Sequence, residues 1–228
     1  MIKICGLSTL ETLETAVTAG ADMVGFVFFP KSPRHLSVEI GAQLAATIRG
    51  RSELVALTVD ADDNLLQSLV DAWKPAVIQC HGVETTARLR DIRTRFNIPI
   101  MKALGISEQD DLKQIEYYAP HCDMLLVDAK PPKNAILPGG NGETFNWDLM
   151  NGVTCSVPLF LSGGLSPENV SEAITRTHVQ GVDVSSGVER TLGIKDLDKI
   201  KLFIENAKRA FSEKAHLHES FATRDNSR

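Results

Sequence analysis

The sequence predicts a single α/β domain in which eight parallel strands close into a barrel. Eight short runs rich in β-branched residues alternate with segments of helical apolar spacing. Strands that alternate with helices are joined by right-handed crossovers, which produce a parallel sheet. No G-x-G-x-x-G follows the first strand, whereas glycine turns follow the last two strands. We therefore expect a (β/α)8 TIM barrel and not an open doubly wound sheet, and a length of 228 residues suits one such barrel.

The predicted elements follow one another in regular alternation. The strands are I-K-I-C (2–5), M-V-G-F-V-F (23–28), L-V-A-L-T-V (54–59), A-V-I-Q-C (76–80), I-P-I-M-K-A-L (98–104), D-M-L-L-V-D (123–128), V-P-L-F-L-S (157–162) and V-Q-G-V-D-V-S (179–185). The helices are Leu10–Ala19, Val38–Ile48, Leu65–Ala72, Thr85–Arg95, Glu108–Tyr118, Pro167–Ile174 and Lys195–Phe211.

Two segments fall outside this alternation. Residues Ala129–Thr144 carry P-P and G-G-N-G, which predicts a mobile loop after the sixth strand. Residues 212–228 are polar and have few apolar side chains with which to dock, so we expect a frayed or disordered tail. The catalytic barrel is thus predicted to span residues 1–211.

Charge and composition exclude several classes of function. A net charge of -5 leaves no basic surplus for nucleic acid. No stretch reaches the roughly 18 apolar residues of a membrane helix, and a first strand at Ile2 leaves no room for a signal peptide. We expect a soluble, cytoplasmic protein, as a monomer or homodimer. The cysteines are scattered without a C-x-x-C pair, so we expect reduced thiols and neither a disulfide framework nor a metal site: Cys5, Cys80, Cys122 and Cys155.

Candidate catalytic residues lie where strands end, because active sites of such barrels form at the carboxyl ends of the strands. Cys5 ends the first strand and Asp128 ends the sixth. Taken alone, the cysteine is compatible with an inert core thiol and the aspartate with a helix cap. Arg34 follows the second strand, where its guanidinium suits a carboxylate, and His81 follows the fourth, where it suits either backbone pairing or substrate contact.

Glycine turns after the seventh and eighth strands predict a phosphate site. Backbone amides in such turns, next to a helix start at Pro167, attract an anion without a side-chain cation. Phosphate between the last two strands is a recurrent use of this fold. The residues that we expect to bind it are Gly163, Gly164, Ser186 and Gly187.

Charged residues are also predicted inside the barrel. Lys3 and Asp183 lie at inward positions of the first and eighth strands, which become neighbours when the barrel closes. A buried charge must be paired, so we predict that these two groups share a polar network. Lys3 also faces the same interior as Cys5 and is therefore a candidate cation for stabilising its thiolate.

Five motifs together resemble one enzyme family. They are K-I-C-G (3–6), G-F-V-F-x-P-K-S-x-R (25–34), Q-x-H-G (79–82), L-S-G-G-L-x-P-E-N-V (161–170) and V-D-V-S-S-G-V-E (182–189). In this order they resemble phosphoribosylanthranilate isomerase of tryptophan biosynthesis. The resemblance implies that Cys5 is the general base, that Asp128 is the general acid and that Arg34 binds the anthranilate carboxylate. We expect His81 and Asp183 to contact the substrate as well.

The resemblance implies an Amadori rearrangement. N-(5-phosphoribosyl)anthranilate would become 1-(2-carboxyphenylamino)-1-deoxyribulose 5-phosphate by proton transfer alone, with no cofactor and no metal. The chain departs from the family pattern at three positions. Cys80 replaces the usual leucine of Q-L-H-G, and we assign it to packing. Glu143 and Asn146 stand where lysine and aspartate are more common, which bears on any loop closure that depends on a cation.

Other readings of the sequence remain open at this point. The aminoimidazole carboxamide ribotide isomerase is a related phosphosugar barrel, but it uses an aspartate at the end of its first strand. Indole-glycerol-phosphate synthase uses a lysine and glutamate set, and Cys5 fits neither enzyme. A barrel that only binds a phosphorylated ligand would not need Cys5 and Asp128 together, and a turnover assay distinguishes it from an enzyme.

Overall fold

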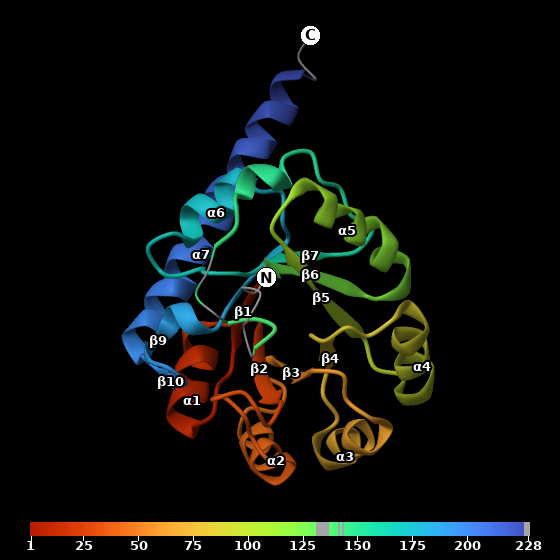
Figure 1. The fold of residues 1–228 in the computed structure, drawn as a ribbon. Helices are drawn as coiled ribbons and strands as arrows, with labels where there is room; N and C mark the ends of the chain where they lie inside the picture. The colour runs from red at the N-terminus through yellow and green to blue at the C-terminus, as the bar shows by residue number, and fades with distance from the viewer. Residues whose placement is uncertain (131–136, 141, 143, 226–228) are drawn as a thin grey trace.

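The predicted barrel is confirmed by the computed structural model, which describes residues 1–130, 137–140, 142 and 144–225 (Figure 1). Its eight parallel strands pair in chain order, and β8 pairs with β1 to close the ring. The strands are β1 (Ile2–Cys5), β2 (Met23–Phe28), β3 (Glu53–Thr58), β4 (Val77–Cys80), β5 (Ile100–Ile106), β6 (Met124–Ala129), β7 (Leu159–Leu161) and β8 (Gly181–Val184).

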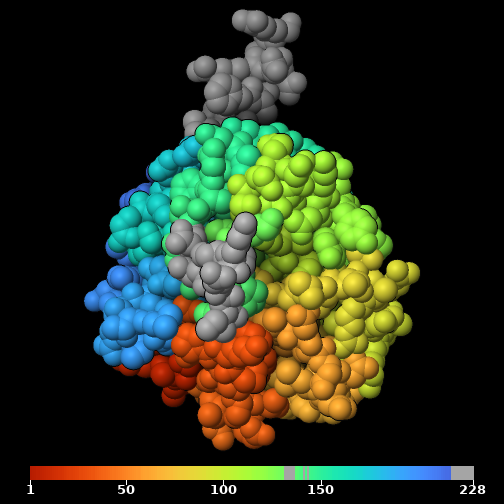
Figure 2. Space-filling model, in the orientation of Figure 1, coloured from red at the N-terminus to blue at the C-terminus, as the bar shows by residue number. Residues whose placement is uncertain are grey.

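Helices surround the barrel, and the segments follow one another around it in chain order, as the colours of Figure 2 show. The α-helices are α1 (Leu10–Ala19), α2 (Val38–Thr47), α3 (Asp63–Trp73), α4 (Thr86–Phe96), α5 (Lys113–Tyr118), α6 (Val170–Arg176) and α7 (Leu197–Asp225). Short 3-10 turns are η1 (Gln109–Leu112), η2 (Ala119–His121), η3 (Trp147–Met150) and η4 (Ser186–Val188). Side-chain oxygens accept from backbone amides at the starts of α1 to α4, at Thr9, Ser37, Asp62 and Thr85.

Alternation along the strands separates an interior core from an outer one. On β4, Val77 packs inside the barrel, whereas Ile78 and Cys80 belong to the outer core between strands and helices. Cys80 therefore packs as predicted. Near the carboxyl ends of the strands, Cys5 and Leu57 form part of a separate small interior cluster. The interior is thus filled with side chains up to the level at which the site begins.

The predicted pairing of Lys3 with Asp183 is confirmed. The two residues are register partners on β1 and β8, and the Lys3 ammonium donates a 2.7 Å hydrogen bond to Oδ1 of Asp183. Ser162 donates to the other carboxylate oxygen at 3.2 Å. Burial lowers the pKa of Lys3, but Asp183 and Cys5 outweigh it and raise this pKa above its usual value. Lys3 is therefore charged inside the barrel.

The structure differs from the sequence prediction near the last helix. An antiparallel hairpin of β9 (Glu189–Thr191) and β10 (Ile194–Lys195) precedes α7, so Lys195 ends a strand and does not start the helix. Helix α7 continues past the predicted end at Phe211 to Asp225, and its last turns extend away from the barrel (Figure 1). The polar residues after 211 include glutamate, lysine and alanine, which prolong a helix that already exists. Helix α6 begins at Val170, because Ser166–Asn169 form a separate turn with Asn169 Oδ1 accepting from the Ser166 amide.

The loop after β6 and the expectations on membrane helices and metal sites can be compared only with the residues that the structure describes. Most of the predicted loop after β6, including Glu143, lies outside the described residues, whereas residues 137–140 line the mouth of the barrel. Asn146 caps η3 by accepting a 3.0 Å hydrogen bond from the Asp148 amide. None of the described helices is long and apolar enough to cross a membrane. Among the same residues, no group of His, Cys, Asp and Glu is arranged to hold a metal ion.

Candidate active site

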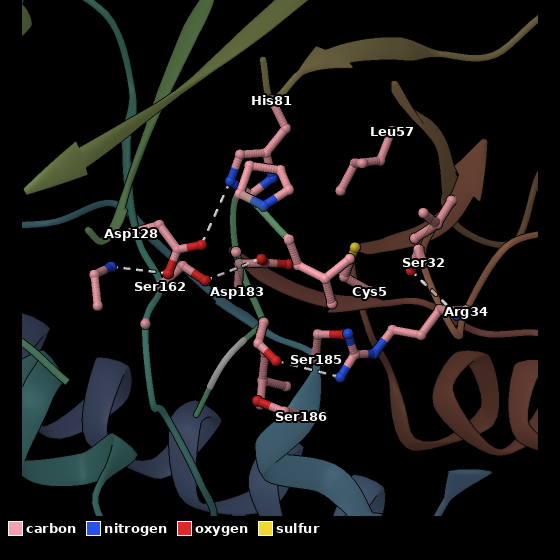
Figure 3. A pocket seen from close by; sticks show the side chains of 18 of the residues that line it. Cys5, Ser32, Arg34, Leu57, His81, Asp128, Ser162, Asp183, Ser185 and Ser186 are labelled. Carbon is pink, nitrogen blue, oxygen red and sulfur yellow. Dashed lines mark hydrogen bonds and ion pairs between the residues drawn. The ribbon is translucent and has the colours of Figure 1, made fainter. Parts of the chain in front are cut away.

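One cavity at the carboxyl ends of the strands brings the predicted residues together (Figure 3). It opens to solvent, and the empty space within it, open solvent included, is about 760 Å³. Of the nine residues predicted for the site, eight line it: Cys5, Arg34, His81, Asp128, Gly163, Gly164, Asp183 and Ser186. Gly187, the ninth residue, does not line the cavity. A Cβ atom on Gly187 would come within 1.8 Å of the Leu165 carbonyl oxygen. Its backbone thus packs the turn after β8 against the turn after β7.

Cys5 is the last residue of β1, and only 2% of it is exposed. Burial raises the pKa of its thiol, and Asp183 acts in the same direction, while the ammonium groups of Lys3 and Lys195 act in the opposite direction. The net effect is a raised pKa. Lys3 is thus a cationic neighbour, as expected, but burial, together with Asp183, outweighs its effect, and the thiol of the free protein is protonated.

Asp128 is the penultimate residue of β6, and Figure 3 shows it on the other side of the cavity from Cys5. Its Oδ1 atom accepts a 2.8 Å hydrogen bond from the Ala129 amide. Its Oδ2 atom lies 3.5 Å from Nε2 of His81. A Cβ atom on Gly139 would come within 2.3 Å of this Oδ2 and 2.6 Å of a His81 ring carbon, so glycine lets the loop backbone pass over both side chains.

The loop that carries His81 is held by a buried ion pair that sequence reasoning missed. Lys102 on β5 donates 2.8 Å to Oε2 of Glu84 and 2.6 Å to the Gly82 carbonyl. Glu84 also accepts from the amides of Gly82 and Asp60. Burial raises the pKa of Glu84, but Lys102 and these amides outweigh it and lower the pKa below its usual value. Lys102 also contacts the Cys80 carbonyl at 3.4 Å, so the pair holds the backbone on both sides of His81.

A second unpredicted network holds Arg34. Its Nε and Nη2 atoms donate to the two carboxylate oxygens of Glu189 at 2.6 and 3.0 Å. Lys195 donates 2.9 Å to Glu189 and 2.8 Å to the Ser185 carbonyl. Both Glu189 and Lys195 are buried, and burial lowers the pKa of Lys195. The hairpin of β9 and β10 places Glu189 and Lys195 opposite each other in register, and no motif in the sequence predicted that hairpin.

Part of the Arg34 guanidinium remains available to a ligand in the cavity, because Glu189 binds only its Nε and Nη2 atoms. Its Nη1 atom has no acceptor among the residues that the structure describes, and Nη2 makes a further 3.4 Å contact with the Gly140 carbonyl. The cluster of Arg34, Lys195 and Glu189 holds two positive charges and one negative charge. One positive charge is therefore in excess at this wall of the cavity.

The turns after β7 and β8 face the cavity with backbone groups. Gly163 and Gly164 have φ angles of 84° and 58°, in the left-handed region that favours glycine. Within the described ranges, their amides have no protein acceptor. Ser186 begins the 3-10 turn η4 beside them. This arrangement leaves backbone donors without a protein acceptor at one end of the cavity, where they are available to an anion.

Comparisons with known proteins agree with this geometry. Residues 2–206 match the model of the family described as N-(5'-phosphoribosyl)anthranilate (PRA) isomerase. N-(5'-phosphoribosyl)anthranilate isomerase of Bradyrhizobium diazoefficiens is 53% identical over 208 residues, covering 91% of this chain and 93% of the relative.

Solved structures of the same enzyme have the same fold. The crystal structure of phosphoribosyl anthranilate isomerase from Thermotoga maritima has a TM-score of 0.80 at 36% identity, covering 91% of this chain and 98% of that one. Another structure holds reduced 1-(o-carboxyphenylamino)-1-deoxyribulose 5-phosphate, with a TM-score of 0.77 at 34% identity and coverage of 91% and 97%. The family model spans most of the chain, and the relatives match it almost end to end. The chain belongs to the N-(5'-phosphoribosyl)anthranilate isomerase family.

Proposed function

We propose that this protein converts N-(5'-phosphoribosyl)anthranilate into 1-(2-carboxyphenylamino)-1-deoxyribulose 5-phosphate, an Amadori rearrangement of tryptophan biosynthesis. The observation that carries the proposal is one cavity lined on opposite sides by Cys5 and Asp128 (Figure 3). Family membership and the relative that holds a reduced form of the product support the same reaction. The steps transfer protons only, so the side chains of this cavity suffice for them.

Acid catalysis is the role we assign to Asp128. In its protonated form it donates to the ring oxygen of the sugar, the C1–O bond breaks, and the nitrogen lone pair forms a Schiff base at C1. The remaining oxygen of this carboxyl group accepts from the Ala129 amide, which fixes the side chain. His81 lies next to the other oxygen and orients it toward the substrate.

Base catalysis is the role we assign to Cys5. As a thiolate it removes the proton from C2. The electron pair of that bond forms the C1–C2 double bond, and the π electrons of the protonated Schiff base return to the nitrogen, which keeps the proton it already carries. The resulting enolamine becomes the ketone when C1 takes up a proton and the C2 hydroxyl loses one. Burial raises the pKa of the thiol, so the thiolate forms with help from the adjacent lysines.

Substrate binding divides between two walls of the cavity. Arg34 binds the anthranilate carboxylate through the Nη1 edge that Glu189 does not occupy, and the excess positive charge of this cluster matches one carboxylate. The phosphate binds to the amides of Gly163, Gly164 and Ser186 at the other wall. Gly187 supports the phosphate site by keeping the two turns in contact. Asp183 keeps Lys3 oriented and faces the sugar.

The test is turnover of N-(5'-phosphoribosyl)anthranilate by the purified full chain, with product separated by chromatography. In deuterated water the proposed steps place one deuterium at C1 of the product, which NMR detects. Cys5→Ala is the control, and it should bind the substrate without converting it. Binding without turnover by the unaltered chain would overturn the proposal in favour of a barrel that only binds its ligand. A relative from Thermotoga maritima is described as dimeric, and we propose a monomer or homodimer here, which light scattering distinguishes.

A further inference from the structure

Gln79 is a buried residue of the cavity to which the proposed mechanism gives no part. It lies on β4 between Ile78 and Cys80, which both pack outward. Its side chain therefore points into the barrel, two positions along the strand from the interior residue Val77. It is completely buried and lines the same cavity as Cys5.

The amide of Gln79 has no partner for either of its polar atoms among the residues that the structure describes. Burying an amide without a partner destabilises a fold, so such groups are rare, and a ligand that enters the site is one explanation for them. The other unpartnered buried side-chain atoms in the described part are the indole nitrogens of Trp73 and Trp147, and neither residue lines the cavity. Gln79 alone in this set faces a space that a ligand enters.

The chemistry of the amide selects one kind of ligand group. It carries a donor and an acceptor and no charge, so it matches a hydroxyl, which also donates and accepts. A phosphate or a carboxylate is acceptor-only and would leave the amide oxygen unpaired. Those two anions also have other donors here, in the Gly163–Gly164 turn and at Arg34.

The position of Gln79 fits the sugar part of the substrate. Its register partner on β3 is Leu57, which packs with Cys5 in the upper interior cluster. The amide thus borders the layer in which the general base lies. On the basis of the proposed function, we propose that Gln79 binds a hydroxyl group of the opened ribose chain and holds C2 toward the Cys5 thiolate.

The experiment compares Q79M with the unaltered full-length protein. Methionine keeps the length of the side chain and removes both polar atoms, so a group whose partner is the substrate should be dispensable for folding. We expect the urea midpoint to stay the same or rise. We expect kcat/KM to fall by about tenfold or more, the value of one hydrogen bond of this kind, and the affinity for the reduced product analogue to fall by a similar factor.

Two controls separate binding from general damage. W73F removes another unpartnered buried N–H, in the outer core and outside the lining of the cavity, and should leave kcat/KM within about twofold. Inhibition by inorganic phosphate should be the same in Q79M and the unaltered protein, because the phosphate turn is intact. Q79L serves as a second apolar variant, with the same expected result.

Each other outcome overturns the inference. If Q79M and Q79L keep kcat/KM within about twofold of the unaltered protein, Gln79 binds no substrate group. If they lose stability or fail to fold, the amide has a structural partner instead. These results leave the proposed function intact as long as the unaltered protein turns over its substrate. Absence of that turnover overturns the proposed function and this inference together.

Discussion

Replacing Lys3 with methionine tests the ion pair that ties the first strand to the last. The Lys3 ammonium is completely buried and lies 2.7 Å from Oδ1 of Asp183, whose side chain is 6% exposed. Methionine removes the charge at similar length and leaves the carboxylate buried, with Ser162 as its one remaining side-chain partner among the described residues. Breaking such a pair costs about 3–5 kcal/mol, because one charge is left uncompensated. In a chain of this size that corresponds to a fall in Tm of roughly 6–20 °C.

The assay is a double-mutant cycle in urea. Lys3→Met alone should lower the free energy of unfolding by the amount given above. Adding Asp183→Asn removes the orphaned charge and keeps an acceptor for Ser162, so the double variant should recover at least half of the loss. A single variant that loses less than about 1 kcal/mol would mean that the pair is solvated or neutral in solution, and the reasoning on buried charge in this barrel would be refuted.

Three further predictions concern catalysis. Cys5→Ala and Asp128→Asn should each lower kcat by about a hundredfold or more while circular dichroism shows a retained fold, and an active, folded Cys5→Ala protein would assign the base to another group. Burial raises the pKa of the Cys5 thiol above its ordinary value of 9.0, so the rate of its alkylation by iodoacetamide should still increase with pH at and above that value. A plateau of this rate near neutral pH would contradict the prediction. A bound product analogue should slow the alkylation. Gly164→Leu should raise KM, because its side chain would enter the turn that we propose as the phosphate site, and the left-handed φ of 58° there adds a loss of stability. An unchanged KM in the folded variant would place phosphate elsewhere.

Sequence patterns were sufficient for the features that depend on strand periodicity. The eight strands and their inward positions follow from local spacing, so the pairing of Lys3 with Asp183 could be predicted across a sequence separation of 180 residues. Cys5, Asp128 and the glycine turns could be placed at the cavity for the same reason, since each lies at the carboxyl end of a strand or directly after it.

Features that depend on tertiary contacts were not predictable in this way. Glu189 and Lys195 meet because of a short hairpin whose strands have three and two residues, too few for a periodic signal. From the sequence alone, Glu84 and Lys102 look like two separate solvated charges. They form a buried pair only because the loop after β4 packs against β5. The protonation state of the Cys5 thiol in the free protein was also not predictable from the sequence, because its pKa depends on the balance between burial and two nearby ammonium groups.

The closure of β8 onto β1 has a consequence for how the protein is made. Cys5 precedes Asp183 and Lys195 by most of the barrel and is therefore synthesised before them. A nascent chain therefore carries an ordinary exposed thiol until its C-terminal strands emerge and dock, and non-local pairings of this kind form slowly. Loss of alkylation at Cys5 should mark the moment of closure during refolding, so the residue that we assign as the base also serves as a natural probe of barrel assembly.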